Sequence, residues 1–282
     1  MKFQIKNQFL EASFDSLGAE LISLISKGRE YIWEGNPEFW NKQSPILFPT
    51  IGSLKNDTYF FEGEEYHLPR HGFAREKEFD VIEQKDDKII FSLKSDEETL
   101  KVYPFIFELQ IQYRLVENQL EVQYKVKNNS EDEMFFSIGG HPGFALSENF
   151  EDYSLVFETN DELKYSLLEN HLLADETQIL ETVNNNLALN YSLFEKDALV
   201  FKNHQIQSVT IQENGKDFVK VSFKNFSDLG IWTKINAPFI CIEPWFGHAD
   251  LIKTNQKLQE KEGILSLKPN VEFKSVYFIE LF

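Results

Sequence analysis

Hydrophobic and polar residues alternate along most of this chain, the pattern of β-strands that bury one face. The alternation predicts an opening hairpin over residues 3–14 and further strands over 18–24 and 30–33. A meander follows at 80–84, 88–93, 105–115 and 120–126, with Asp86-Asp87 and Glu117-Asn118 in its turns. The same period returns at 207–212, 219–223, 229–235 and 275–281. Strands therefore dominate the prediction.

Helical signals are few and short. Residues 36–40 and 96–100 each suit one helical turn, and 250–256 is a weaker third candidate. The sequence has no linker rich in Pro, Ser or Gly, no internal repeat and no Gly-rich phosphate cradle between a strand and a helix. We therefore predict an all-β fold, one large antiparallel β-sandwich with a few short helices, in a single domain over residues 1–282.

Composition supports this prediction. Of the 282 residues, 42% are hydrophobic, which is enough for a large core. Phenylalanine dominates the aromatic residues, with 27 against 10 Tyr and 4 Trp, and aromatic side chains favour strands.

Charge and cysteine content exclude several classes of function. The net charge of −18, from 28 basic and 46 acidic residues, disfavours nucleic-acid binding. The single cysteine, Cys241, allows no internal disulfide and lies in an apolar run, which is typical of packing. The first ten residues lack the apolar core of a signal peptide, and no apolar run reaches membrane-spanning length. We expect a soluble cytoplasmic protein with no membrane partner.

The strongest candidate for chemistry is Glu243, which directly follows the apolar run 239–242 and precedes Pro244-Trp245. A glutamate is rarely buried without a partner. Two interpretations are open: a catalytic base with a raised pKa, or a carboxylate that turns outward into water where the strand ends.

Two of the six histidines lie in distinctive loops. His141 stands in Gly139-Gly140-His141-Pro142-Gly143, where glycines permit a ligand to approach closely and the proline favours extended backbone at the histidine. His71 stands in Arg70-His71-Gly72 and is an open case between a functional and a structural role. His67, His171 and His204 lie among polar residues and are predicted to be solvated, whereas His248 could line the site of Glu243 or cap a loop.

Other chemistries find little support. No two histidines have metal-ligand spacing, so no metal is predicted, and no Gly-x-Ser-x-Gly nucleophile elbow occurs. Asp197 precedes the apolar segment 198–201, where it could bind a sugar hydroxyl or form an ordinary turn.

Taken in order, these segments resemble the aldose 1-epimerase (galactose mutarotase-like) family, in its LacX-like branch. The matching segments span nearly the whole chain: 44–52, 70–75, 140–144, 197–199 and 242–245. The resemblance implies a β-supersandwich with an open sugar-binding cleft, a small-molecule sugar as partner and no cofactor. It also implies that Glu243 is the general base, that His141 is the general acid, and that His71 and Asp197 bind sugar hydroxyls.

One position departs from the family's pattern. Many relatives carry an arginine in the loop after Gly52, whereas here Ser53 and Leu54 follow and Lys55 is the nearest cation. A lysine lacks the planar fork of arginine, so Arg75 is the candidate substitute. Two alternatives to a hexose mutarotase stay open: a hexose-6-phosphate 1-epimerase and a noncatalytic carbohydrate-binding protein. We expect a monomer or a homodimer.

Overall fold

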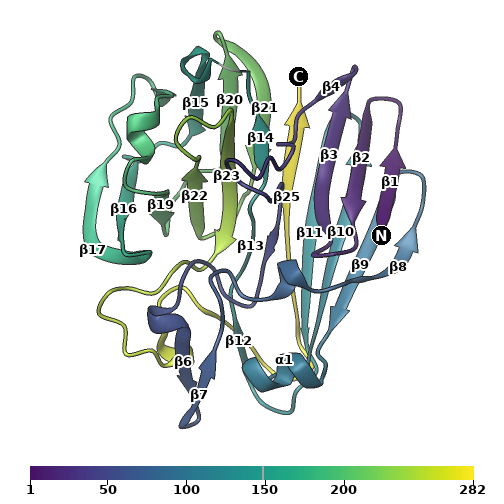
Figure 1. The fold of residues 1–282 in the computed structure, drawn as a ribbon, viewed down its shortest axis with the longest axis vertical. Coiled ribbons are helices and arrows are strands. Elements are labelled where there is room, and N and C mark those ends of the chain that lie inside the picture. The colour runs from purple at the N-terminus through teal and green to yellow at the C-terminus, as the bar shows by residue number, and fades with distance from the viewer. Residues whose placement is uncertain (148) are drawn as a thin grey trace.

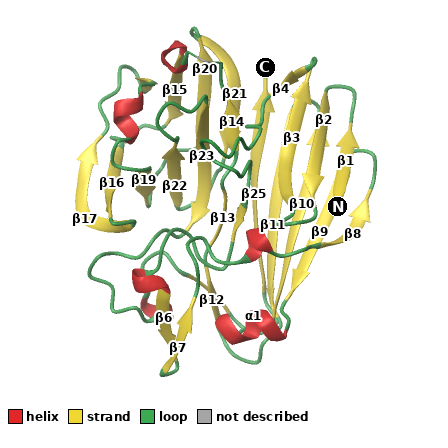
Figure 2. Cartoon of the chain, in the orientation of Figure 1, coloured by secondary structure: helices red, strands yellow, loops and turns green. Residues whose placement is uncertain are grey.

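The computed structural model describes residues 1–147 and 149–282, and most of them lie in β-strands (Figures 1 and 2). Three large antiparallel sheets form the body of the molecule. The first has the order β1-β2-β3-β4, and its strands are β1 (Lys2–Lys6), β2 (Leu10–Asp15), β3 (Glu20–Ser26) and β4 (Arg29–Glu30).

The second sheet has nine strands in the order β18-β15-β20-β21-β25-β11-β10-β9-β8. In chain order they are β8 (Asp80–Gln84), β9 (Lys88–Lys94), β10 (Phe107–Val116), β11 (Gln119–Asn128), β15 (Tyr153–Glu158), β18 (Asn186–Ala188), β20 (Ser208–Glu213), β21 (Lys216–Ser222) and β25 (Glu272–Leu281).

The third sheet carries the candidate site. Its order is β17-β16-β19-β22-β23-β13-β5, and β14 pairs with β23 on the same edge as β13. Its strands are β5 (Ile46–Leu47), β13 (Ile138–Gly140), β14 (Gly143–Ala145), β16 (Lys164–Glu169), β17 (Leu172–Ile179), β19 (Leu199–Lys202), β22 (Asp228–Trp232) and β23 (Phe239–Phe246).

The remaining elements are small. Two hairpin-sized sheets pair β6 (Thr58–Phe61) with β7 (Glu64–His67), and β12 (Met134–Phe136) with β24 (Leu265–Leu267). The one α-helix of the described residues is α1 (Glu97–Val102), which Asp96 caps through a capping box. Single 3₁₀ turns lie at Lys55–Asp57, Ala74–Glu76, Phe150–Asp152, Tyr191–Phe194 and Leu258–Glu260.

The two other large sheets cover the same face of the nine-stranded sheet. Phe14 of β2 contacts Tyr113 of β10, with ring centroids 4.4 Å apart, and Phe201 of β19 contacts Phe157 of β15 at 6.0 Å. Tyr113 and Phe157 share one face through the cross-strand register. One apolar cluster, from Ile5 to Leu281, therefore fills the space between the layers. Figure 1 shows β1–β4 in front of β8–β11 and the eight-stranded sheet beside them.

The all-β sandwich predicted from the alternation is confirmed. The opening hairpin, the four strands of the meander and the capped turn at 96–100 all lie where the sequence placed them. Residues 36–40 form a turn in which the Phe39 and Trp40 N–H groups donate to the Asn36 carbonyl.

The helix predicted at 250–256 is wrong. Leu251 instead forms a bridge to Leu173. The carboxylate of Asp250 accepts from the backbone N–H of Lys55 at 2.9 Å and from Lys261 Nζ at 2.9 Å. After the bridge the chain makes a turn, in which the Thr254 N–H donates to the Leu251 carbonyl at 3.0 Å. The contacts of Asp250 outweigh the weak local helical preference.

Candidate active site

Strand β23 is buried on both faces, which explains its uninterrupted apolar sequence. Ile240 and Ile242 face the main core, and the alternate residues Cys241, Glu243 and Trp245 face the other side of the sheet. Glu243 lies inside the strand and not at its end, so the outward-turned carboxylate of the second interpretation is wrong. Its residue exposure is 1%.

The connection between β13 and β14 places His141 beside Glu243. Gly139 of β13 pairs with Trp245 and Gly143 of β14 pairs with Cys241, so residues 141–142 pass the middle of β23. Nε2 of His141 lies 3.2 Å from Oε2 of Glu243. The approach lacks hydrogen-bond geometry, and both this carboxylate oxygen and Nδ1 of the imidazole are buried without a hydrogen-bond partner.

Aromatic rings hold the imidazole of His141 in place. The indole of Trp40 lies over it at 4.7 Å between centroids, and Trp232 meets it edge-on at 5.7 Å. His71 meets it edge-on from another side, also at 5.7 Å. Three segments far apart in the sequence therefore converge on the His141 ring.

An open cavity of about 490 Å³ lies over this pair. Three of the four tryptophans in the chain line it, with residues of both charges. Flat rings with a few polar groups suit a sugar, which has both apolar faces and hydroxyls. The lining residues are Trp40, Arg70, His71, Arg75, His141, His171, Phe194, Glu195, Asp197, Ala198, Trp232, Thr233, Lys234, Ile235, Glu243 and Trp245.

Burial shifts both members of the pair toward their neutral forms. It raises the pKa of Glu243 well above its usual value; the charge of Arg70 opposes this rise and that of Asp197 adds to it. Burial also lowers the pKa of His141 to about 3, against a backbone hydrogen bond and with help from the charges of Arg70 and Arg75. Burial therefore favours the neutral carboxyl of Glu243 and the neutral imidazole of His141.

His71 and Asp197 both line the cavity, and both have left-handed backbone, with φ of 70° and 78°. Such backbone is uncommon outside glycine and recurs at functional sites. Gly52 N–H donates to Nδ1 of His71 at 3.1 Å, so the neutral ring carries its proton on Nε2. Nε of Arg70, which is also a donor, lies 3.3 Å from this Nε2. Two N–H groups therefore face each other without an acceptor between them. An acceptor oxygen beside both donors would relieve this conflict.

Arg70 is the main polar residue of the cavity for which the sequence predicted no role. Its Nη1 lies 3.3 Å from Nδ1 of His171, and its Nη2 lies 3.8 Å from Oδ2 of Asp197. The prediction that His171 is merely solvated is wrong in part: its side chain is 63% exposed, yet it lines the cavity and lies 3.4 Å from Asp197. In the sequence, the signal for a role of Arg70 at the site was its position directly before His71.

Arg75 also lines the cavity, where Nη2 donates to the Arg70 carbonyl at 2.9 Å. Its Nε is buried without a hydrogen-bond partner, and burial lowers the pKa of its guanidinium. Lys55, the cation nearest to Gly52 in sequence, points elsewhere: its Nζ donates to the carbonyl of Ile252 at 2.9 Å.

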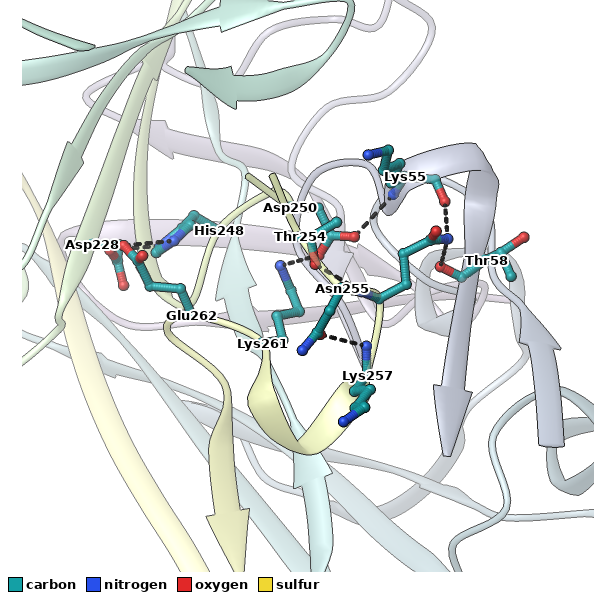
Figure 3. A network of polar contacts seen from close by, with 11 residues as sticks. Lys55, Thr58, Asp228, His248, Asp250, Thr254, Asn255, Lys257, Lys261 and Glu262 are labelled. Carbon is teal, nitrogen blue, oxygen red and sulfur yellow. Dashed lines mark hydrogen bonds and ion pairs between the residues drawn. The ribbon is translucent and has the colours of Figure 1, made fainter. Parts of the chain in front are cut away.

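His248 does not line the cavity, which decides between its two interpretations in favour of a structural role. Its Nδ1 lies 3.1 Å from Oδ1 of Asp228, and both residues are 1% exposed (Figure 3). Burial opposes the ionisation of Asp228, but hydrogen bonds from His248, Ser227 and the Gly247 N–H hold the pKa of this carboxyl below its usual value. Figure 3 also shows the neighbouring pair of Asp250 and Lys261.

His204 is half-buried rather than solvated. Its ring packs edge-on against Phe223 at 5.8 Å, and burial lowers its pKa. His67 is exposed, as predicted. Cys241 is buried, and burial raises the pKa of its thiol well above the usual value, with the charge of Glu243 adding to the rise.

Among the described residues, no helix is both long and apolar enough to cross a membrane.

Comparisons with known proteins agree with this fold. The family model described as Aldose 1-epimerase matches residues 1–263. Protein LacX (plasmid) of Lactococcus lactis subsp. lactis is 35% identical over 299 aligned positions that cover 100% of this chain and 99% of that protein.

Solved structures match over the same extent. A galactose mutarotase related enzyme from Lactobacillus acidophilus has 35% identity and a TM-score of 0.94, covering 100% of this chain and 97% of the other. A galactose mutarotase-like protein from Lactobacillus casei has 30% identity and a TM-score of 0.96, with 100% of both chains covered. The β-supersandwich fold is therefore confirmed.

Proposed function

Because this chain belongs to the aldose 1-epimerase family, we propose that it interconverts the α and β anomers of a hexose by opening and reclosing the sugar ring. We expect it to act in the cytoplasm, on a free sugar and without a cofactor, as one domain over residues 1–282. The observation that carries the proposal is the buried pair of Glu243 and His141, 3.2 Å apart on the floor of a cavity of sugar size.

Ring opening needs two proton transfers. One proton leaves the anomeric hydroxyl, and another reaches the ring oxygen as its bond to the anomeric carbon breaks. The open-chain aldehyde then rotates about the bond between its first two carbons and closes on its other face, with both transfers reversed. A carboxylate and an imidazolium can perform these steps, each contributing roughly 10²–10⁴-fold.

In our proposal, Glu243 removes the proton of the anomeric hydroxyl and His141 protonates the ring oxygen. Burial favours the proton on Glu243, so this direction of catalysis first requires the proton on His141. A sugar hydroxyl that donates to the Glu243 carboxylate favours its ionised form and supplies this bias. Because the two side chains lie close together, the proton can pass directly from Glu243 to His141.

His71, Asp197, Arg70 and Arg75 would hold the sugar. The Nε2–H of His71 and the guanidinium of Arg70 can both donate to one hydroxyl oxygen, which resolves their mutual conflict in the free site. Asp197 accepts from a second hydroxyl. Arg75 donates to the backbone carbonyl of Arg70 and so helps to hold Arg70 in place.

The test is proton NMR exchange between the anomers of glucose and galactose, corrected for the buffer rate. Glu243→Gln should lower kcat by roughly 10²–10⁴-fold, because glutamine cannot take the proton. Glu195→Gln is the matched control, since Glu195 lines the same cavity but is exposed at its rim. A wild-type rate equal to the buffer rate across a broad sugar panel, with sugar binding intact, would favour the noncatalytic carbohydrate-binding protein.

A phosphosugar substrate is the second candidate, favoured by Arg70, Arg75 and Lys234 at the cavity. The same panel should include glucose 6-phosphate and galactose 6-phosphate. Under this alternative, Arg75→Ala would raise the KM for the phosphosugar and leave the KM for the parent sugar unchanged. Equal turnover of both sugars would remove the reason for the alternative.

A further inference from the structure

We propose that His141, Cys241 and Glu243 form a binding site for a zinc ion, and that zinc bound there inhibits the enzyme reversibly. One donor atom from each of these residues lies within 4.8 Å of the others, and all three residues are buried. The three side chains are brought together by the sheet and not by a local sequence motif, which is why spacing along the chain did not reveal them.

The backbone fixes the arrangement. Cys241 and Glu243 stand two residues apart on β23, so their side chains leave the same face of the strand. His141 enters from the connection between β13 and β14, opposite the middle of β23. One strand and the short connection between β13 and β14 therefore hold the three donors.

The distances suit a tetrahedral ion. Zinc bonds of about 2.0–2.1 Å to nitrogen and oxygen place neighbouring donors about 3.3 Å apart. The separation of His141 Nε2 and Glu243 Oε2 is 3.2 Å. The sulfur of Cys241 must approach by up to about 1 Å to complete the set, since its zinc bond is near 2.3 Å and the donors span up to 4.8 Å.

The buried polar atoms also point to a ligand. Oε2 of Glu243 has no hydrogen-bond partner although it is shielded from solvent. Such an orphaned oxygen is costly unless something binds it.

Zinc is the ion that this donor set selects. A thiolate, an imidazole and a carboxylate together match borderline-soft zinc better than magnesium or calcium, which prefer oxygen donors. Its two positive charges are balanced by one thiolate and one carboxylate, so the buried site stays neutral overall. The thiol proton, and the proton on the carboxyl, leave to the buffer as the metal bonds form. Glu243 and His141 line the cavity, from which water would supply the fourth ligand.

Inhibition follows from the shared donors, and this part rests on the proposed function. A zinc ion on Glu243 and His141 occupies the lone pairs through which the two residues would exchange protons with the sugar. The metal thus competes with acid–base chemistry instead of adding to it.

The first experiment measures binding without activity. EDTA-treated, dialysed protein is titrated with ZnCl₂ by calorimetry, and Co²⁺ replaces Zn²⁺ in a parallel absorption measurement. We expect one strong site per chain and a thiolate-to-cobalt charge-transfer band. Cys241→Ala should abolish the band, and Cys241→Ala and Glu243→Gln should each weaken zinc binding by more than about 100-fold. Losing only an outer-shell partner already costs roughly 10–100-fold.

The control variant is His67→Ala, which removes the exposed imidazole 3.3 Å from Glu65 and should leave binding unchanged. Equal zinc affinity of wild type and Cys241→Ala, no thiolate band, or loss of binding in His67→Ala would each overturn the proposed site. If Cys241→Ala does not fold, the zinc affinity of Glu243→Gln still tests the proposed site.

The second experiment measures anomer exchange with and without zinc, for each variant relative to its own metal-free rate. Wild type should lose activity at the zinc concentration that fills the calorimetric site and regain it with EDTA, and Cys241→Ala should resist. Activity that persists with the site filled would overturn the inhibition. A protein with no metal-free activity but a filled site contradicts the proposed function and supports the metal site alone.

Discussion

At the scale of single residues, the sequence marked Glu243 and His141 as candidates and offered a raised pKa of Glu243 as one of two interpretations, but it did not predict the lowered pKa of His141. The sequence placed Glu243 next to an apolar run and His141 between glycines. His141 is packed against Trp40 and Trp232, which come from segments far away in the chain. The residues next to Glu243 and His141 in the sequence do not reveal such packing.

The buried carboxyl predicts a pH-dependent stability. Between the usual pKa of a glutamate and the raised pKa of Glu243, the folded protein keeps a proton that the unfolded chain releases. The free energy of unfolding of the wild type therefore falls as pH rises through this window, by up to about 1.4 kcal/mol per pH unit. Glutamine does not titrate, so Glu243→Gln should gain stability relative to wild type as pH rises.

Urea unfolding of both proteins at several pH values between about 5 and 8 measures this difference. A stability difference that stays constant over that range would mean that Glu243 is ionised in the folded protein. Burial acts on His141 in the opposite direction: its lowered pKa costs stability as pH falls below the usual value of a histidine.

At the scale of elements, glycines at two strand positions make room for a tryptophan. A Cβ atom on Gly230 of β22 would lie 2.4 Å from the ring of Trp245, and one on Gly139 of β13 would also lie 2.4 Å from it. The indole Nε1 donates to the Gly140 carbonyl at 3.2 Å. The ring is thus confined between two strands, beside Glu243, which pairs with Gly230 in the register.

Gly230→Ala should therefore disturb the cavity as well as the fold. We expect a loss of about 1–3 kcal/mol in the free energy of unfolding from overpacking, and a fall of up to about 100-fold in kcat/KM because Trp245 is displaced. Urea unfolding and anomer exchange measure the two effects.

The control is Gly215→Ala, in an open turn with φ of 76°. Its backbone strain should cost a similar 1–2 kcal/mol, roughly, but leave kcat/KM unchanged. A normal kcat/KM in Gly230→Ala would mean that the position of Trp245 does not matter for catalysis.

Alternation predicted many of the longer strands and missed several short ones. The hairpin and the meander have a polar side and could be located within a few residues. Strands such as β5 and β13, with two and three residues, are too short to show an alternation of apolar and polar residues. The helix predicted at 250–256 failed because the partners of Asp250 lie at Lys55 and Lys261.

At the scale of the whole molecule, a buried ion pair helps to join two distant parts of the chain. Lys261 Nζ lies 2.9 Å from Asp250 Oδ1, and their side chains are 4% and 3% exposed (Figure 3). Asp250 also accepts from the backbone of Lys55, next to the small sheet of β6 and β7.

Lys261→Met should cost about 3–5 kcal/mol, because it leaves the Asp250 carboxylate buried without its counter-charge. Urea unfolding measures the loss. Lys257→Met is the matched control on the same segment: its pair with Glu260 also spans 2.9 Å, but both side chains are at least half exposed, so stability should stay close to wild type. Equal effects of the two substitutions would show that burial of the Asp250 pair contributes nothing.

The convergence of the site could be predicted only through the family resemblance. His71, His141, Asp197 and Glu243 are spread over 173 residues of sequence (243 minus 71, counted inclusively), and the sheet register brings them to one cavity. Spacing and period describe neighbours along the chain, whereas this register is set by pairings between distant strands.

The central position of β25 has a consequence for how the chain is made. This strand, residues 272–281, lies between β21 and β11 in the nine-stranded sheet. While the ribosome is still synthesising earlier residues, β11 and β21 have no partner on the sides that later face each other. The two halves of that sheet can join only after residue 281 has been made, so we expect nascent chains to expose two open edges and to depend on chaperones until then.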